Sequence, residues 1–167
     1  KSKSSKPTAR TSKSTIVVME TNQGKIEIEL FMKESPITAK NFLDLVNKGF
    51  YNGLTFHRIV PNFVIQGGDP KGDGTGGPGY TIPDEKSTKK EYRGTLGMAK
   101  SGPNTTGSQF YINLVDNLRL DDAGFTAFAK VVKGMEVVDK IGNLKNSGSP
   151  ENRALEKVIM TRVYLKK

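Results

Sequence analysis

An arginine and a glutamine in the stretch 56–69, FHRIVPNFVIQGGD, have the types and spacing of a binding site. The stretch predicts two short strands joined by a turn. Arg58 and Gln66 are an even number of positions apart, so if the strands stay in phase both side chains lie on one face. That face also carries the apolar residues Val60 and Val64. It is a candidate binding groove that holds one permanent cation.

The remaining reactive side chains do not indicate a hydrolase or a metal-dependent enzyme. His57 is the only histidine, and without a serine and an acid at matching spacing it is not favoured as a general base. We expect it to line the groove or to support Arg58. With no cysteine and a single histidine, a zinc site of those two ligand types is excluded, and we predict no metal and no cofactor. The pair Asp121-Asp122 is interpreted as a turn.

The glycine-dense stretch 69–79, DPKGDGTGGPG, predicts a loop. It is not a phosphate-binding loop, because no Gly-Lys-Ser/Thr sequence follows it. It also lacks the third acidic position and the closing glutamate of a calcium-binding EF-hand loop. We therefore expect a loop that frames the groove.

The chain of 167 residues suits one domain, and its net charge of +9 is placed unevenly. Residues 1–14 hold five basic residues and no acidic one, and they contain no large apolar residue. This composition predicts a disordered basic tail over 1–14, ahead of one domain over 15–167. The tail is interpreted first as a solubilising spacer. The alternatives are a contact with anionic surfaces or a nucleic-acid arm, although without interleaved aromatic residues no specific nucleic-acid partner is predicted.

The remaining compositional signals bear on location and assembly. No apolar run is long enough for a transmembrane helix. The sequence begins with lysine rather than methionine, which leaves the compartment unknown, with a cytoplasmic protein favoured over an exported one whose leader has been removed. No pattern indicates an oligomer interface, and we expect a monomer.

About eight short strands and two helices are predicted along the domain. One helix begins at Ser35-Pro36 and stops at Gly49, and a shorter one covers 135–141. A loop is expected over 120–125. Many short strands with Gly- and Pro-rich loops favour a barrel or a sandwich, whose open ends the two helices could plug. The expected strands cover 15–20, 25–30, the pair within 54–67, 94–99, 109–114, 126–132 and 156–165.

Four motifs, FHRIVPNFVIQGGD, GTGGPGY, GTLGMAKSGPNTTGSQFYI and LDDAGFTAFAKVVKGMEVVDKI, resemble the cyclophilin family of peptidyl-prolyl isomerases, in order and over roughly residues 15–167. The resemblance implies a mainly β fold: a closed eight-stranded antiparallel β-barrel capped by two α-helices. It also implies cofactor-independent cis-trans isomerisation of Xaa-Pro bonds. The implied partners are proline-containing peptides and unfolded proteins.

Such a reaction needs no nucleophile. The bond before proline rotates over a barrier of about 18–20 kcal/mol because its C–N bond is partly double. A donor that hydrogen-bonds the imide nitrogen as it becomes pyramidal would localise the lone pair and lower that barrier. A guanidinium suits this role, since it is always charged and presents several donors in a rigid fork.

The resemblance also implies the residue roles. Arg58 would be the catalytic residue, with Gln66 as its partner and Gly74 in the loop that flanks the residue before proline. The backbone of Ala99, Lys100 and Ser101 would pair with the substrate chain, and Gln109 would lie along the groove. Phe110 should be core. The proline pocket would be lined by Phe63, Val64, Tyr111, Leu120 and Phe125.

Five positions depart from the usual family pattern. Val64 stands where methionine is usual, and Lys100 replaces a common asparagine. Tyr111 adds a hydroxyl at the pocket, and Phe125 replaces a frequent histidine. Arg119 stands where many members have the tryptophan that helps to bind cyclosporin, so cyclosporin-type ligands are expected to bind weakly.

Two other function classes remain open. The domain could be a proline-peptide receptor whose turnover is incidental, although retention of Arg58 favours an enzyme. Alternatively, the basic tail could determine the function of the protein by delivering the domain to nucleic acid or to an anionic surface.

Overall fold

The computed structural model describes residues 14–167, in which eight strands and three helices are present. Residues 1–13 of the expected disordered tail lie outside this range, so that expectation stays a prediction. The elements are, in chain order, β1 (Ile16–Thr21), β2 (Gly24–Leu30), α2 (Pro36–Asn47), β3 (Arg58–Val60), β4 (Val64–Gly67), β5 (Thr95–Met98), β6 (Phe110–Asn113), α3 (Arg119–Asp122), β7 (Ala127–Lys133), α4 (Met135–Gly142) and β8 (Met160–Leu165).

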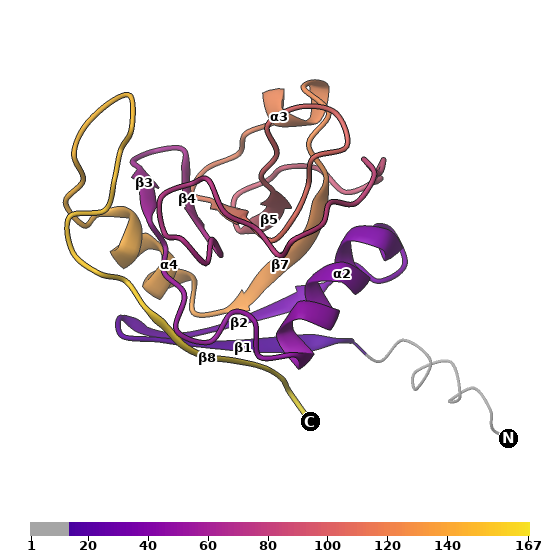
Figure 1. Cartoon of the computed structure of the whole chain (residues 1–167), viewed down its shortest axis with the longest axis horizontal. Coiled ribbons are helices and arrows are strands. Elements are labelled where there is room, and N and C mark those ends of the chain that lie inside the picture. The colour runs from indigo at the N-terminus through magenta and orange to yellow at the C-terminus, as the bar shows by residue number, and fades with distance from the viewer. Residues whose placement is uncertain (1–13) are drawn as a thin grey trace, which may run out of the picture.

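All strands belong to one antiparallel sheet in the order β3-β4-β6-β5-β7-β2-β1-β8, which curls around the core (Figure 1). The expected closed barrel is wrong, because the edge strands β3 and β8 do not pair with each other. Two backbone hydrogen bonds, from Phe56 to Val158 (2.9 Å) and from Met160 to Leu54 (2.7 Å), nevertheless join the segments beside these edges.

The irregular chain before β8 explains the open sheet. The expected strand over 156–165 begins only at Met160. Upstream, Gly148 and Asn152 have positive φ angles of 84° and 49°, which a strand does not adopt. The chain therefore reaches the β3 edge as a loop, and its contacts there are isolated bridges such as Thr55 to Ile159.

Helix α2 begins at Pro36, as the sequence predicts. The N–H groups of its first turn are capped by Glu85, a residue far along the chain. Ser35 occupies the N-cap position without a side-chain cap, because its hydroxyl donates to the Ala127 carbonyl at 2.7 Å. The Glu85 carboxylate instead accepts the N–H groups of Ile37 (2.9 Å) and Thr38 (2.8 Å). A carboxylate at this position also complements the helix dipole. The segment after the glycine-rich loop is thus tied to α2.

The expectation of two helices is wrong, since α3 forms where a loop was predicted. It is a single turn in which the N–H groups of Leu120 and Asp121 donate to Asn117 O (2.9 Å) and Leu118 O (3.0 Å). One turn is too short to show helical periodicity in the sequence. The longer helices α2 and α4 lie on opposite sides of the curled sheet (Figure 1).

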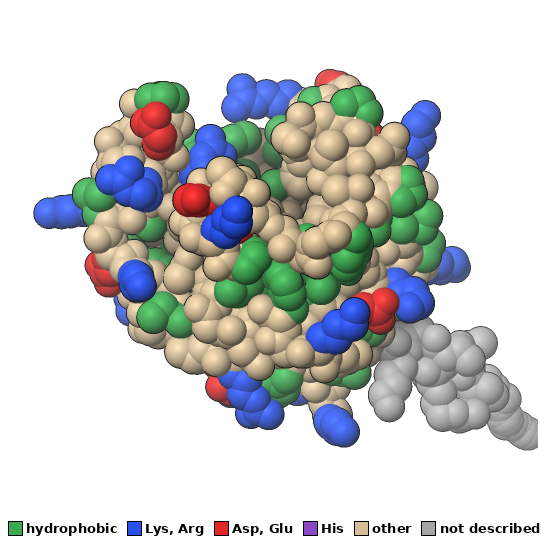
Figure 2. Space-filling model, viewed as in Figure 1, with side chains coloured by type: hydrophobic (Ala, Val, Ile, Leu, Met, Phe, Trp, Pro, Cys, Tyr) green, Lys and Arg blue, Asp and Glu red, His purple; other side chains and the backbone are tan. Residues whose placement is uncertain are grey.

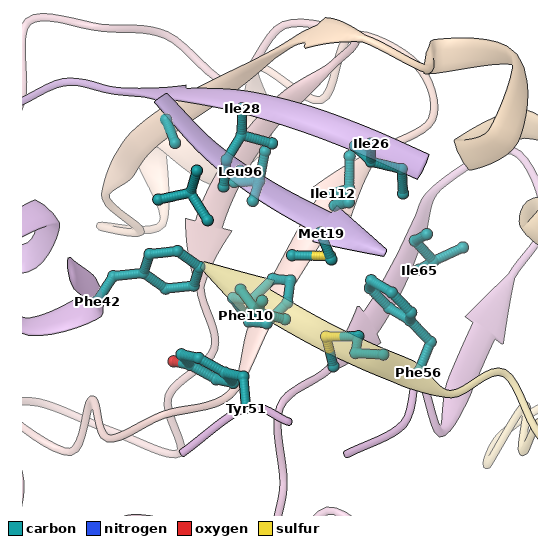
Figure 3. Close-up of a cluster of buried hydrophobic side chains, with 14 of the residues drawn as sticks. Met19, Ile26, Ile28, Phe42, Tyr51, Phe56, Ile65, Leu96, Phe110 and Ile112 are labelled. Atoms are coloured by element: carbon teal, nitrogen blue, oxygen red, sulfur yellow. The ribbon is translucent and has the colours of Figure 1, made fainter. Parts of the chain in front are cut away.

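An aromatic cluster fills the space inside the sheet (Figure 3). The ring of Phe110 meets those of Phe42, Tyr51 and Phe56 edge-on, with centroids 5.5, 5.6 and 5.7 Å apart. Each such pair contributes about 0.5–1.5 kcal/mol beyond the area it buries. The prediction that Phe110 is core is confirmed, since it is fully buried. Its neighbour Tyr111 therefore faces the other side of β6.

Candidate active site

The β3–β4 hairpin places Arg58 beside Gln66. The two residues are cross-strand partners, as are Val60 and Val64, and Arg58 Nη1 donates to Gln66 Oε1 at 3.2 Å. Asn62, with φ of 61°, makes the turn possible. The prediction that these side chains share a face is confirmed, although the strands pair side by side rather than continuing one another.

Nine of the residues singled out from the sequence line one cavity of about 200 Å³. We call it the apolar pocket. It opens between the β3–β4 hairpin and α3, where Figure 2 shows the surface hollowed with hydrophobic side chains inside. Its lining consists of Arg58, Phe63, Val64, Gln66, Ala99, Lys100, Tyr111, Leu120 and Phe125.

The back of the apolar pocket is an aromatic corner. The Tyr111 ring, from β6, is only 4% exposed and meets the Phe125 ring edge-on at 6.1 Å between centroids. The Tyr111 hydroxyl, expected at the pocket, is instead buried behind it against Gly97. The corner can therefore receive an apolar ring, while Arg58 supplies a charge at the wall.

A relay of amide side chains fixes Arg58 relative to the glycine-rich loop (residues 69–79). Gln66 accepts from Arg58 and donates through Nε2 to Gln109 Oε1 at 3.0 Å. Gln109 Nε2 in turn donates to the carbonyls of Gly74 (3.0 Å) and Gly76 (2.9 Å). Each amide uses both its acceptor and its donor, so the relay has a defined direction.

The glycine-rich loop folds around the buried carboxylate of Asp69. Its oxygens accept the backbone N–H groups of Lys71 (2.8 Å), Asp73 (3.1 Å) and Gly74 (2.6 Å). Burial alone would raise the pKa of Asp69, but these backbone hydrogen bonds, with one from Gly76, lower the pKa below its usual value. The loop is thus held by one ionised side chain.

A second cavity, of about 330 Å³, continues from the apolar pocket along the glycine-rich loop. We call it the long groove. Gly74, Ser101 and Gln109 line it, and Gln66, Ala99 and Lys100 line both cavities. Sequence reasoning missed Thr75, Tyr80 and Thr105 in its walls. The motif GTGGPGY, already interpreted as framing a groove, was the available signal.

Lys100 and Arg119 take different positions at the rim. Lys100 is 13% exposed, because its Nζ donates to Gly124 O (2.9 Å), pairs with Asp84 (3.3 Å) and lies 5.4 Å from the centre of the Phe125 ring. Arg119 is exposed on α3, with its guanidinium carbon 5.1 Å from the centre of the Phe63 ring. Arg119 does not line the apolar pocket but covers one of its walls.

His57 lies near Gly74, where an added Cβ would be 3.8 Å from its Nε2, but it lines neither the apolar pocket nor the long groove. It lines a separate cavity of about 350 Å³ with Thr55, Asp69 and Arg153. Both ring nitrogens are buried and have no hydrogen-bond partner among residues 14–167. Burial lowers the pKa of His57, and Arg58 lowers it further, against opposing effects of Asp69 and Asp73. The ring is therefore neutral at pH 7.

Within residues 14–167, no group of three or more His, Asp or Glu side chains is arranged to hold a metal ion. None of the helices described is long and apolar enough to cross a membrane.

Fold and site together define a mainly β protein that can receive an apolar ring next to a fixed guanidinium. The model of the family described as cyclophilin type peptidyl-prolyl cis-trans isomerase/CLD matches residues 16–165. The chain therefore belongs to the cyclophilin-type peptidyl-prolyl cis-trans isomerases, which confirms the resemblance drawn from the motifs.

Individual relatives and solved structures similar to this chain carry the same family name. The chain is 46% identical over 164 residues to a peptidyl-prolyl cis-trans isomerase of Acinetobacter baylyi, covering 91% of this chain and 86% of the relative. It is 41% identical to the isomerase CYP18-2 of Arabidopsis thaliana, covering 88% and 92%. Among solved structures, a cyclophilin-type isomerase of Cryptosporidium parvum superimposes with a TM-score of 0.85 at 33% identity, covering 93% of this chain and 99% of that one. The same Cryptosporidium protein was also solved in the presence of the dipeptide Ala-Pro.

Proposed function

We propose that this isomerase uses Arg58 as its catalytic residue on Xaa-Pro bonds whose proline ring occupies the apolar pocket. The observation that carries the proposal is the Arg58–Gln66 pair at the wall of that pocket. A binding site for apolar rings alone would gain nothing from a guanidinium held there. The substrates proposed are proline-containing segments of unfolded or partly folded proteins.

The proposed isomerisation assigns a role to each group of residues that lines the apolar pocket. Phe63, Val64 and Tyr111 would hold the proline ring still while the carbonyl side of the bond rotates. As the imide nitrogen becomes pyramidal, its lone pair becomes a hydrogen-bond acceptor that the Arg58 guanidinium can meet. This interaction exists only near the transition state, so it raises the rate rather than the affinity.

The stretch 99–101, which follows β5, would align the substrate chain along the long groove. Some of its backbone donors are already used, since Ala99 N–H donates to Gln109 O (2.9 Å) and Ser101 N–H to Thr105 Oγ1 (2.8 Å). Pairing with a peptide would therefore rely on the remaining groups, chiefly the backbone of Lys100. The contact is shorter than a full added strand.

The test is a cis-to-trans assay on a short proline peptide. We expect Arg58→Ala to lower kcat/KM by roughly a hundredfold or more, as loss of one preorganised donor does in other enzymes. Arg162→Ala is the matched control, because Arg162 is exposed on β8 and stacks on Tyr164. Circular dichroism checks that both variants fold.

Three outcomes are informative. A loss confined to Arg58→Ala supports the proposal. Equal activity in the two variants removes Arg58 from the chemistry. A wild-type protein that binds the peptide but does not exceed the spontaneous rate would be a receptor and not an enzyme.

A further inference from the structure

A cluster of buried polar side chains lies behind the apolar pocket, on the far side of Tyr111. Glu91 and Asn113 are completely buried, and Thr95 and Asn117 are 7% exposed. Buried polar groups of this density cost free energy unless they bond one another, and a carboxyl costs the most. The family reaction, as proposed above, makes no use of any of them.

The cluster is connected by side-chain hydrogen bonds. Asn113 Nδ2 donates to Glu91 Oε1 at 2.9 Å and to Thr95 Oγ1 at 2.8 Å. Asn113 Oδ1 accepts from Asn117 Nδ2 at 2.8 Å. Glu91 is thus the end of a chain that runs through β6 toward α3.

The same chain reaches the side walls of the apolar pocket. Asn117 Nδ2 donates to the Phe63 carbonyl at 3.0 Å, and Asn117 O accepts from Leu120 N–H at 2.9 Å. The backbone of Glu91 closes the connection, since Glu91 O accepts from Asn117 N–H at 2.8 Å. Two walls of the pocket, Phe63 and Leu120, are therefore held by Asn117, which Glu91 holds in turn.

Two atoms of the cluster lack a hydrogen-bond partner of good geometry within residues 14–167. They are Glu91 Oε2 and the Tyr111 hydroxyl, and each is near enough to shift the pKa of the other group. The hydroxyl fits only because position 97 is glycine, where an added Cβ would overlap the phenol oxygen. Glu91 is thus placed against the residue that forms the back wall of the pocket.

We propose that Glu91 is a positioning residue for the apolar pocket, holding its back wall through Tyr111 and its side walls through Asn113 and Asn117. This inference rests on the proposed function, because it assumes that the pocket receives proline. Glu91 itself touches no substrate. It would act by keeping three walls at the spacing that grips the ring.

The charge of Glu91 gives the proposal a distinctive signature. Two titratable groups face its carboxyl, Tyr111 from β6 and Asp121 from α3. Burial raises the pKa of Glu91, the hydrogen bond from Asn113 and the nearby Tyr111 hydroxyl oppose the rise, and the charge of Asp121 adds to it. The carboxyl therefore stays neutral to a higher pH than an ordinary glutamate. Once ionised, it would draw the Tyr111 hydroxyl toward Oε2 and repel Asp121, and both movements disturb the pocket.

The experiment measures binding of a short proline peptide to the full chain, by fluorescence anisotropy from pH 5 to pH 9, with kcat/KM in parallel. For the wild type we expect the Kd to rise roughly fivefold to tenfold as the pH increases. Glu91→Gln keeps an acceptor for Asn113 but cannot ionise, so its Kd should stay level relative to its own value at pH 5. Tyr111→Phe should reduce the pH step, whatever its affinity, and keep only the part that comes from repulsion of Asp121. Glu151→Gln, at an exposed position, is the control and should keep the wild-type profile.

Identical pH profiles for wild type and Glu91→Gln would overturn the proposal, and so would a profile lost in Glu91→Gln but kept in full in Tyr111→Phe. A lower melting temperature of Glu91→Gln with an unchanged profile would indicate a purely structural role and would also overturn it. If Glu91→Gln does not fold, Tyr111→Phe alone decides. Because the main measurement is binding, a wild type that binds without turnover defeats the proposed function and still tests Glu91.

Discussion

The two walls of the apolar pocket are built in different ways. One wall comes from the strands β3, β4 and β6, where the backbone is paired in the sheet and side chains such as Val64 and Tyr111 are nearly fully buried. The other comes from the stretches 99–107 and 117–125 and continues along the long groove into the glycine-rich loop; none of these segments belongs to the sheet. There, single side chains such as Asp69 and Asn117 bind the backbone N–H and C=O groups.

This contrast predicts which kind of substitution should disrupt each wall. A paired, close-packed wall tolerates the loss of a polar atom but has no room for added volume. A wall held by single side chains tolerates volume at its surface but loses its shape when one acceptor is removed. Four substitutions test the contrast, in order of decreasing effect.

Added volume directly behind the strand wall, at Gly97 of β5, should have the largest effect. In Gly97→Ala the new methyl group would overlap the Tyr111 hydroxyl and ring, so Tyr111 must move or the strand must shift. We expect a loss of about 3 kcal/mol in the free energy of unfolding, with much lower isomerase activity. Urea unfolding measures the first and the peptide assay the second. Gly77→Ala, where an added Cβ meets nothing, is the control.

Removing the acceptor that organises the glycine-rich loop should rank next. Asp69→Ala leaves backbone N–H groups of Lys71, Asp73 and Gly74 without their partner. We expect a loss of about 2 kcal/mol in unfolding free energy. Asp73→Ala, an exposed aspartate of the same loop, should cost under about 0.5 kcal/mol. Equal losses in the two variants would contradict the role given to Asp69.

The stabilisation from Asp69 should also depend on pH. Its folded pKa is lowered, so the stabilisation is present above the pKa of the unfolded chain and is lost as the pH falls through the folded value. The wild type should therefore lose more stability in acid than Asp69→Ala does. Unfolding curves at neutral and acidic pH provide the comparison.

Interrupting the amide relay should lower activity with little effect on stability. Gln109→Ala separates Gln66 and Arg58 from the glycine-rich loop, while the side chain removed is only partly buried. We expect kcat/KM to fall roughly tenfold, which corresponds to about 1.4 kcal/mol. Gln23→Ala removes an exposed hydrogen bond to Glu156, far from the relay, and should leave the rate unchanged.

A substitution at the exposed end of the loop wall should have the smallest effect. Arg119→Trp restores a residue common in the family at a position where volume is tolerated. We expect cyclosporin to inhibit this variant several-fold more tightly, worth about 1 kcal/mol, with the isomerase rate nearly unchanged. Arg119→Ala separates the loss of the cation from the gain of the indole. Tight inhibition of the wild type would contradict the expectation of weak binding.

Features set by residues close together in the sequence could be predicted, and features set by contacts between distant residues could not. Arg58 and Gln66 were placed on one face because strand alternation is a local rule. The open sheet was missed because its cause is the irregular chain around Asn152, which only the folded context shows to reach the β3 edge. Glu91 follows two lysines and resembles an exposed loop residue. Its burial depends on Asn113 and Asn117, more than twenty positions away, and no local pattern reports this.

The loop that joins the two sheet edges has a consequence for aggregation. Unpaired edge strands can template the addition of other chains, and the unfolded polypeptides proposed above as substrates would be candidates for such addition. Within residues 14–167, backbone groups beside the β3 edge are already used by the chain before β8, as in the hydrogen bonds from Ile59 to Asn152 (2.8 Å) and from Ala154 to His57 (2.9 Å). A client segment would have to displace the protein's own loop to extend the sheet there. The β3 edge is therefore protected from added strands by hydrogen bonds to a loop, without the closed strand pairing of a barrel.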